Sequence, residues 1–438
     1  MSFQSVIRSA VVAASLCAVC GTSHAKAEGN GNAASVDLSQ SRLVRSLVGR
    51  SESVRLKAIA SLKFKNEAKR DALDELVHAL REHSNQVVAG RPIAGSTPAL
   101  IQLIASVDDP AATRALVDLL DSDQMQISMF CANALGRQKC IEAIESLKQQ
   151  VGRSEWKTHY GFRFNLVRAL TLMDHPDAYE FLAQIRRNVD GQLLHEMNTV
   201  FQGITVDDFL GDEERFAAWK NGSTTGPSVK LAGYSESPDS IFKDATYSES
   251  ANRIQLRRQK YYGIDIEAKR LVFVIDHSGS MKKGSSHNGR WGSRLWHAKD
   301  ALIKAIEALP EDDEFGIIFY AETVRQWKKG LVVATPDNKQ DAKAFVYRLG
   351  FGGSTNTHGA LCESMNFDDD LEAVFLLTDG IPSSGAIVHP DHIVNDIVRQ
   401  NQLRHLKINT IGIAVNSKTK SFLATLAKRC SGEFTQPE

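Results

Sequence analysis

The sequence has no excess of either charge and, outside its first residues, no long apolar run. Its 438 residues carry 52 Lys and Arg against 52 Asp and Glu, so the formal net charge is zero. A neutral chain gives no reason to expect nucleic acid or a membrane surface as a partner. Outside residues 1–27 no segment approaches the ~20 apolar residues of a spanning helix. We therefore expect no stable transmembrane segment in the mature chain.

Cysteine is scarce, with six residues in the whole chain. Two lie in the first 27 residues, and none of the others forms a C-x-x-C pair, so the spacing gives no support for a zinc site. An exported protein can form disulfides. Scattered cysteines are nevertheless interpreted first as buried apolar side chains, and no pairing follows from the sequence. The four cysteines of the mature chain are Cys131, Cys140, Cys362 and Cys430.

The N-terminal residues have the layout of a secretory signal peptide. Arg8 precedes the apolar stretch Ser9–Gly21, which is too short to span a bilayer comfortably, and an A-x-A cleavage site ends at Ala27. We therefore predict a signal peptide at 1–27 and a short linker at 28–38, with an uncleaved anchor as the alternative. Export would place the protein in a periplasm, at a cell surface or outside the cell.

Residues 39–220 are rich in Ala and Leu at helical spacing. A period of 30–45 residues made of two helices is typical of an α-solenoid, in which stacked hairpins bury faces that one hairpin cannot bury alone. The units resemble HEAT-like repeats, and a non-repeating bundle is the alternative. Residues 204–220 break the rhythm, and we expect them to close the stack. The repeat aligns on Ala68, Ala112, Ala143 and Ala178, at intervals of 44, 31 and 35 residues.

The pattern changes after a Ser-, Gly- and Pro-rich segment at 221–260, which we interpret as a linker. From 261 to 438, apolar strand candidates alternate with amphipathic helices. The strands are continuously apolar, as expected when helices cover both faces of a sheet. This alternation predicts a doubly wound, Rossmann-like α/β domain with a mostly parallel sheet. The clearest strand candidates are Leu271–Ile275, Phe315–Tyr320, Ala373–Leu377 and Ile408–Val415.

Oxygen-bearing side chains occur at three places in this domain. Asp276, Ser278 and Ser280 follow the first strand, Asp379 follows another, and Thr355 lies in a glycine-rich loop. Ligands of open α/β sheets bind at the carboxyl ends of the strands, so we expect the three places to meet. Two carboxylates and three hydroxyls suit a hard divalent cation. We predict one bound cation, Mg²⁺ first, with Mn²⁺ or Ca²⁺ as alternatives.

The pattern Asp276-x-Ser278-x-Ser280, with Thr355 in GGSTNT and Asp379 in LLTDG, resembles the metal-ion-dependent adhesion site (MIDAS) of von Willebrand factor type A domains. The resemblance covers about residues 269–438, and with the upstream helices the chain is similar to bacterial exported proteins of this type. It implies that the two serines bind the metal directly and that the other three residues bind directly or through water. It also implies that a partner protein's carboxylate fills the remaining coordination position.

An insertion at 282–293 follows the serines, and we expect it at the rim of the metal site. Lys282 and Lys283 stand where a second metal would require acids, so we expect a single ion. These lysines, with Arg290 and Trp291, would help to hold an acidic partner, or they form a solvated loop. The nearby histidines His277 and His358 are expected to pack or cap locally rather than bind the metal.

Signatures of catalysis are missing. A serine hydrolase of the α/β type needs a G-x-S-x-G turn, and the residues after the first strand, DHSGS, do not supply it. Phosphatases of the haloacid dehalogenase type need a second Asp where this chain has Ser278. We therefore expect a non-enzymatic protein that uses the metal to bind an acidic residue of a partner. In the alternative, the helical repeats carry recognition as a scaffold and the type A domain is structural. The oligomeric state does not follow from the sequence.

Overall fold

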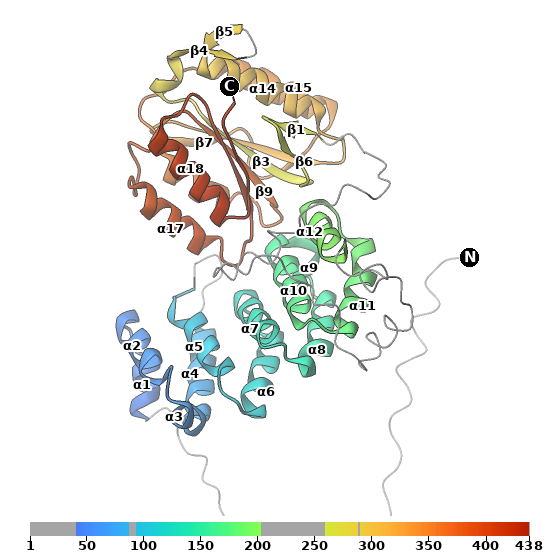
Figure 1. The fold of residues 1–438 in the computed structure, drawn as a ribbon, viewed down its shortest axis with the longest axis vertical. Helices are drawn as coiled ribbons and strands as arrows, with labels where there is room; N and C mark the ends of the chain where they lie inside the picture. Colours follow the sequence, from blue (N-terminus) through green and yellow to red (C-terminus); the bar gives the residue numbers. More distant parts are fainter. Residues whose placement is uncertain (1–40, 87–92, 203–258, 288–289, 438) are drawn as a thin grey trace, which may run out of the picture.

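The computed structural model of the protein describes residues 41–86, 93–202, 259–287 and 290–437. The predicted signal peptide, the linker at 28–38, the segment 204–220 and most of the linker 221–260 lie outside the described residues. A helical region comes first, and an α/β domain follows it (Figure 1). Among the described residues, no helix has the length and apolar character needed to cross a membrane.

The described N-terminal region is helical, as its Ala- and Leu-rich spacing predicts. Neighbouring helices pack on one another in chain order, so that α5 contacts α2 and α7, and α7 contacts α10 (Figure 1). Three of the four aligned alanines are fully buried, but Ala143 lies in a 3-10 turn and the others in α-helices. The HEAT-like repeat therefore stays a prediction. The helices are α1 Arg42–Val48, α2 Glu52–Leu62, α3 Asn66–Asp71, α4 Leu73–Asn85, α5 Ser96–Ala105, α6 Pro110–Asp118, α7 Met125–Arg137, α8 Ile144–Gln149, α9 Glu155–Thr158, α10 Tyr160–Met173, α11 Pro176–Ile185 and α12 Gly191–Gln202.

A twisted sheet forms the centre of the α/β domain, in the order β11-β10-β9-β3-β6-β7, with β8 also beside β6. The first five of these strands run parallel, whereas β7 and β8 pair with β6 in the antiparallel sense. The predicted α/β sheet is therefore present. The strands are β3 Arg270–Asp276, β6 Glu314–Tyr320, β7 Val324–Gln326, β8 Val332–Val333, β9 Ala373–Thr378, β10 Lys407–Gly412 and β11 Phe434–Thr435.

Helices cover both faces of this sheet, which explains its continuously apolar strands. Side chains alternate along β3, so that Phe273 packs with α14 and α15, while Val272 and Val274 pack with α16, α17 and α18. The five helices are α14 Arg294–Ala308, α15 Pro336–Arg348, α16 Thr357–Met365, α17 Pro390–Gln400 and α18 Ser417–Arg429.

The structure differs from the predicted strands at the end of β10 and in two short hairpins. The predicted strand Ile408–Val415 ends at Gly412, and Ala414 then adopts a left-handed backbone with φ of 48°. The insertion after the serines folds as an antiparallel hairpin of β4 Gly284–His287 and β5 Arg290–Ser293. A second short hairpin, β1 Lys260–Tyr261 with β2 Ile264–Asp265, leads into the domain.

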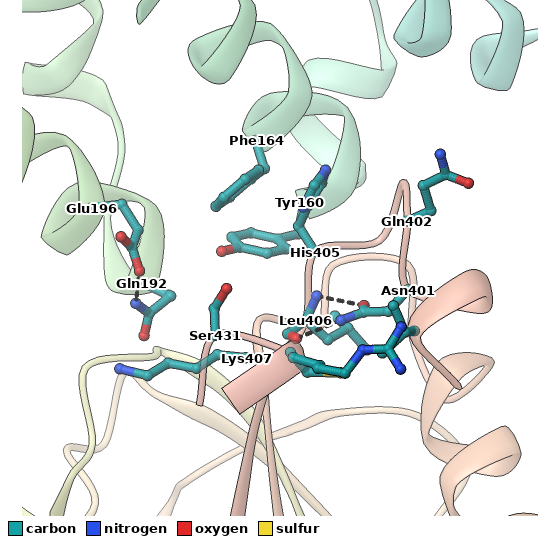
Figure 2. Close-up of a pocket in the computed structure, with 13 residues that line it drawn as sticks. Tyr160, Phe164, Gln192, Glu196, Asn401, Gln402, His405, Leu406, Lys407 and Ser431 are labelled. Carbon is teal, nitrogen blue, oxygen red and sulfur yellow. Dashed lines mark hydrogen bonds between the residues drawn. The ribbon is translucent and has the colours of Figure 1, made fainter. Parts of the chain in front are cut away.

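The helical region packs against the loops that precede β9 and β10, at the amino ends of the parallel strands. Phe164 of α10 stacks on the ring of His405, with centroids 4.4 Å apart. The side-chain amide of Asn165 donates to the carbonyl of Leu403 at 2.8 Å. Gly161 meets that carbonyl so closely that an added Cβ would lie 2.5 Å from it. Figure 2 shows Phe164 and His405 among the residues that line a small pocket, to which α10, α12 and the start of β10 contribute.

An ion cluster joins the same two regions. The guanidinium of Arg270, the first residue of β3, pairs with Asp190 at 2.6 Å and with Glu372, and its Nε lies 3.3 Å from Asp370. Asp190 comes from the helical region and precedes α12, whereas the other two acids precede β9. Three carboxylates around one largely buried guanidinium tie the two regions together at their shared boundary.

Glu372 is the most buried member of that cluster, with a fully enclosed side chain. Its Oε2 accepts the backbone N–H groups of Gln192 at 2.8 Å and Lys269 at 3.0 Å. Gly191, with φ of 59°, leaves room for this carboxylate, because a Cβ there would lie 2.2 Å from Oε2. Burial raises the pKa of Glu372 to about 7, and the charge of Arg270 opposes that rise.

Candidate metal centre

Asp276 is the last residue of β3 and lies at the carboxyl edge of the sheet, the edge opposite the helical region. Its carboxylate is fully buried. Oδ1 accepts the backbone N–H of Ser278 at 2.8 Å, and Oδ2 accepts the hydroxyl of Thr378 at 2.6 Å. The parallel pairing of Ile275 with Leu377 brings Thr378 beside Asp276. Both oxygens are thus held in fixed directions.

A chain of short contacts links the remaining strand-end residues. The hydroxyls of Ser278 and Ser280 lie 3.1 Å apart, and the Ser280 hydroxyl donates to Asp379 Oδ1 at 2.6 Å. Asp379 directly follows β9, the neighbour of β3 in the sheet. Its other oxygen, Oδ2, accepts from Arg294 at 2.8 Å. Four of the five predicted ligands therefore form one hydrogen-bonded group.

Thr355 lies in an adjoining loop that is joined to this group through the backbone. The N–H of Gly279 donates to the carbonyl of Gly353 at 2.8 Å. The N–H of Thr355 is held by the hydroxyl of Ser383 at 2.9 Å, in the loop after β9. Thr355 itself is buried, and its loop contacts the serine turn on one side and the β9 loop on the other.

The glycines of this loop are required by close contacts. A Cβ on Gly352 would lie 2.4 Å from the Cβ of Ala321. The N–H of Gly353 donates to Glu322 Oε2 at 2.6 Å. A hydrogen bond from the backbone N–H of Glu322 itself, together with this one, holds the pKa of Glu322 below its usual range. Glu322 follows β6, so three parallel strands contribute to the support of the site.

The donor set fits a small hard cation. An octahedral ion with ligands at ~2.1 Å has neighbouring oxygens ~3 Å apart, which is close to the 3.1 Å between the Ser278 and Ser280 hydroxyls. Burial raises the pKa of Asp276 to about 6, and the nearby charge of Asp379 adds to the rise. A divalent cation between the two carboxylates would offset both effects.

Sequence reasoning missed three residues of this centre. Arg294 begins α14 and provides the positive charge that Asp379 contacts. The Thr378 hydroxyl holds Asp276, and Glu322 holds the glycine-rich loop. Thr378 could have been found, because a Thr next to Asp379 at the end of a strand beside β3 must face Asp276. The other two carry no signal in their spacing.

The surroundings of the centre include both histidines and the hairpin. His277 Nδ1 lies 3.0 Å from the carbonyl of Gly350, and His358 Nε2 lies 3.0 Å from Asp396 Oδ2. Both rings thus have partners within the domain, and their packing or capping role stays a prediction. The hairpin β4–β5 connects the serine turn to α14, and Trp291 on it is 78% exposed.

Comparison with known proteins identifies the domain. Residues 269–435 match the model of the von Willebrand factor type A domain. Inter-alpha-trypsin inhibitor heavy chain H3 of Bos taurus is 33% identical over 134 residues, 28% of this chain and 14% of the relative. Heavy chain H1 of Mesocricetus auratus is 33% identical over 129 residues, 27% of this chain and 13% of the relative. The chain thus spans about a seventh of the length of the curated relatives it matches.

Two solved structures are similar to part of this chain. The von Willebrand factor type A protein from Catenulispora acidiphila is 20% identical, with a TM-score of 0.32 over 40% of each chain. Proximal thread matrix protein 1 from the mussel byssus, with a zinc-occupied MIDAS motif, is 16% identical, with a TM-score of 0.29 over 38% of this chain and 43% of that one. The two curated relatives above are mammalian, so the bacterial exported type stays a prediction. Residues 269–435 of this chain are a von Willebrand factor type A domain.

Proposed function

We propose that this protein is a non-enzymatic, metal-ion-dependent binding protein, and that its type A domain holds one divalent cation through Asp276, Ser278, Ser280, Thr355 and Asp379. The observation that carries the proposal is the convergence of two carboxylates and the serine hydroxyls at the strand edge farthest from the helical region. Mg²⁺ is the first candidate, because all the donors are oxygen. Mn²⁺ and Ca²⁺ are the alternatives.

The partner that this chemistry selects is a protein with an exposed Asp or Glu side chain. A cation held by neutral hydroxyls and two carboxylates keeps room for one further anionic ligand. A partner's carboxylate would complete the coordination and be attracted by the ion's charge.

The hairpin supports this choice of partner. Lys282 and Lys283 are exposed beside the serine turn, and Trp291 presents an exposed ring. Aromatic side chains are enriched where protein surfaces bind one another, and the two ammonium groups would attract an acidic partner. An exported location, in a periplasm, at a cell surface or outside the cell, belongs to the same proposal.

A peptide selection tests the proposal on the mature chain. Displayed random peptides are selected for binding to the mature chain in Mg²⁺, and the binding of the selected peptides is measured again with EDTA. We expect the selected peptides to share an Asp or Glu whose change to Asn or Gln abolishes binding. The selected peptides should not bind in EDTA, and they should not bind the Thr355→Ala variant. The Ser354→Ala variant, which removes the adjacent hydroxyl of the same loop, should bind them normally.

The opposite result supports the alternative function. If peptides bind equally well with EDTA and to Thr355→Ala, the metal does not contact the partner. Recognition would then lie with the helical region as a scaffold, and the type A domain would be structural.

A further inference from the structure

A second group of metal-binding side chains lies between α16 and α17, outside the oxygen cluster. His358 and Cys362 come from α16, and Asp396 comes from α17. One ligand atom from each lies within 4.8 Å of the other two. His358 Nε2 is 3.0 Å from Asp396 Oδ2 and 3.5 Å from Cys362 Sγ. Imidazole nitrogen, sulfur and carboxylate oxygen together form a donor set typical of zinc.

The spacing of these atoms matches the edges of a zinc tetrahedron. With Zn–N of ~2.0–2.1 Å and Zn–S of ~2.3 Å, neighbouring nitrogen and sulfur ligands lie ~3.6 Å apart, and nitrogen and oxygen ligands ~3.4 Å apart. The observed 3.5 Å and 3.0 Å need shifts of only a few tenths of an ångström. His358 Nε2 faces both the thiol and the carboxylate, and the Cys362 thiol and a carboxylate oxygen of Asp396 lie within 4.8 Å of one another.

That shared nitrogen argues against a catalytic triad. In a Cys–His–Asp relay the thiol and the carboxylate contact different ring nitrogens, so that the imidazole passes a proton between them. Here His358 Nε2 makes both contacts. The geometry is that of ligands around a point rather than of groups in a line.

The site consists of two pairs of residues, each pair on one face of a helix. His358 and Cys362 are four residues apart on α16, and Asp396 and Gln400 are four apart on α17, so each pair lies on one helix face. The Gln400 amide nitrogen lies 2.7 Å from Asp396 Oδ2 and 3.5 Å from Cys362 Sγ. A flip of this amide would turn its oxygen toward the centre as a fourth ligand, and water is the other candidate.

Supporting contacts hold the ligands in place. Arg399 pairs with Oδ1 of Asp396, which leaves Oδ2 directed at the centre, and such outer partners are a regular feature of metal sites. His358 is buried, while Cys362 and Asp396 are partly buried. The site is thus sheltered but can be reached from solvent.

We propose that His358, Cys362 and Asp396 form a binding site for a zinc-like divalent ion, separate from the Mg²⁺ site. An ion here would cross-link α16 to α17. The first residues of α16 follow the loop that contains Thr355, so the cross-link would also restrict the motion of that loop. The proposal does not rest on the proposed function, because the two sites share no ligand.

Co²⁺ titration of the mature chain, without the two leader cysteines, tests this site, because cobalt substitutes for zinc and reports its ligands. A thiolate bound to Co²⁺ gives a charge-transfer absorption in the near ultraviolet, which an all-oxygen site cannot produce. The titration is run in excess Mg²⁺, which occupies the oxygen site. We expect one equivalent of this absorption per chain, and its loss when Zn²⁺ is added.

Three variants assign the absorption. Cys362→Ser and His358→Gln should both abolish it, and the second covers the case in which the first does not fold. Cys140→Ser is the matched control, because the Cys140 thiol lies 3.3 Å from Glu142 and belongs to no group of three metal-binding side chains among the described residues. This variant should keep the full signal. No absorption in the wild-type chain, or an absorption that survives Cys362→Ser or His358→Gln, would overturn the proposal.

Discussion

Arg270 and Asp276 are the first and last residues of the same strand, β3, and their charged groups serve opposite ends of the domain. Arg270 binds acids at the boundary with the helical region, whereas Asp276 belongs to the oxygen cluster. Six steps of ~3.3 Å separate them by about 20 Å. The described helices of residues 41–202 therefore lie at the end of the sheet opposite to the oxygen cluster.

The boundary should contribute strongly to stability through Glu372. Glu372→Ala leaves two backbone N–H groups without their acceptor and removes one of the acids that neutralise Arg270. Breaking a buried charge cluster of this kind costs about 3–5 kcal/mol. We expect that loss in the free energy of unfolding, measured by urea denaturation of the full chain.

Glu307→Ala is the control for that measurement. Glu307 of α14 pairs with Lys343 of α15 at the exposed surface. An ion pair of this kind contributes about 0–1 kcal/mol. Equal losses of unfolding free energy in Glu372→Ala and Glu307→Ala would contradict the described role of Glu372 between the helical region and the type A domain.

Two adjacent acids before β6 should give opposite pH dependences. Burial raises the pKa of Asp313 to about 6, while a hydrogen bond from Lys269 lowers the pKa of Asp312. Between an unfolded pKa of ~3.9 and about 6, folded Asp313 keeps a proton that the unfolded chain has lost. Its contribution to stability is therefore complete below pH 4 and is lost as the pH rises through 6.

Urea denaturation at pH 4 and pH 7 measures the difference. The stability of Asp313→Asn relative to the wild type should rise between these pH values by about 1–3 kcal/mol, since one pKa unit corresponds to ~1.4 kcal/mol. Asp312→Asn should lose relative stability as the pH rises over the acid range. The same pH trend in both variants would contradict the assigned burial.

Arg294 should compete with the metal ion for Asp379. Its guanidinium contacts Asp379 Oδ2, so it repels a divalent cation in the same group. We expect Arg294→Gln to bind Mg²⁺ several-fold more tightly in calorimetry. In EDTA the same variant should be less stable, because two neighbouring carboxylates then lack a counter-ion.

Lys304→Gln serves as the comparison, since Lys304 lies on the same helix and pairs with the exposed Asp300. Both its metal affinity and its stability in EDTA should match the wild type. A loss of Mg²⁺ affinity in Arg294→Gln would show that the arginine orients Asp379 for the metal instead of competing with it.

The sequence predicted what depends on local pattern. Continuous apolar runs marked β3, β6 and β9, because strands covered on both faces need no polar residues. Asp276 and Asp379 could be placed at one edge, since parallel strands end together. The short strands β7 and β8 escaped prediction because two or three residues carry no period.

Contacts between distant segments could not be predicted. Glu372 looks like one more acid after Asp368, Asp369 and Asp370, yet its N–H donors are 180 and 103 residues away. The cysteine spacing gave no sign of the His358 group, because its third member lies 38 residues along the chain, on another helix. Such groups arise from packing and leave no motif.

Calorimetric titration of Mg²⁺ into the full chain tests the central claim most directly. The wild type and Ser354→Ala should each bind one ion per chain, while Ser278→Ala and Thr355→Ala should bind far more weakly or not at all. Ser278→Ala removes one hydroxyl and no charge, so its loss of binding would assign that oxygen to the metal. Equal Mg²⁺ binding by all four proteins, or none by the wild type, would contradict the metal-dependent account.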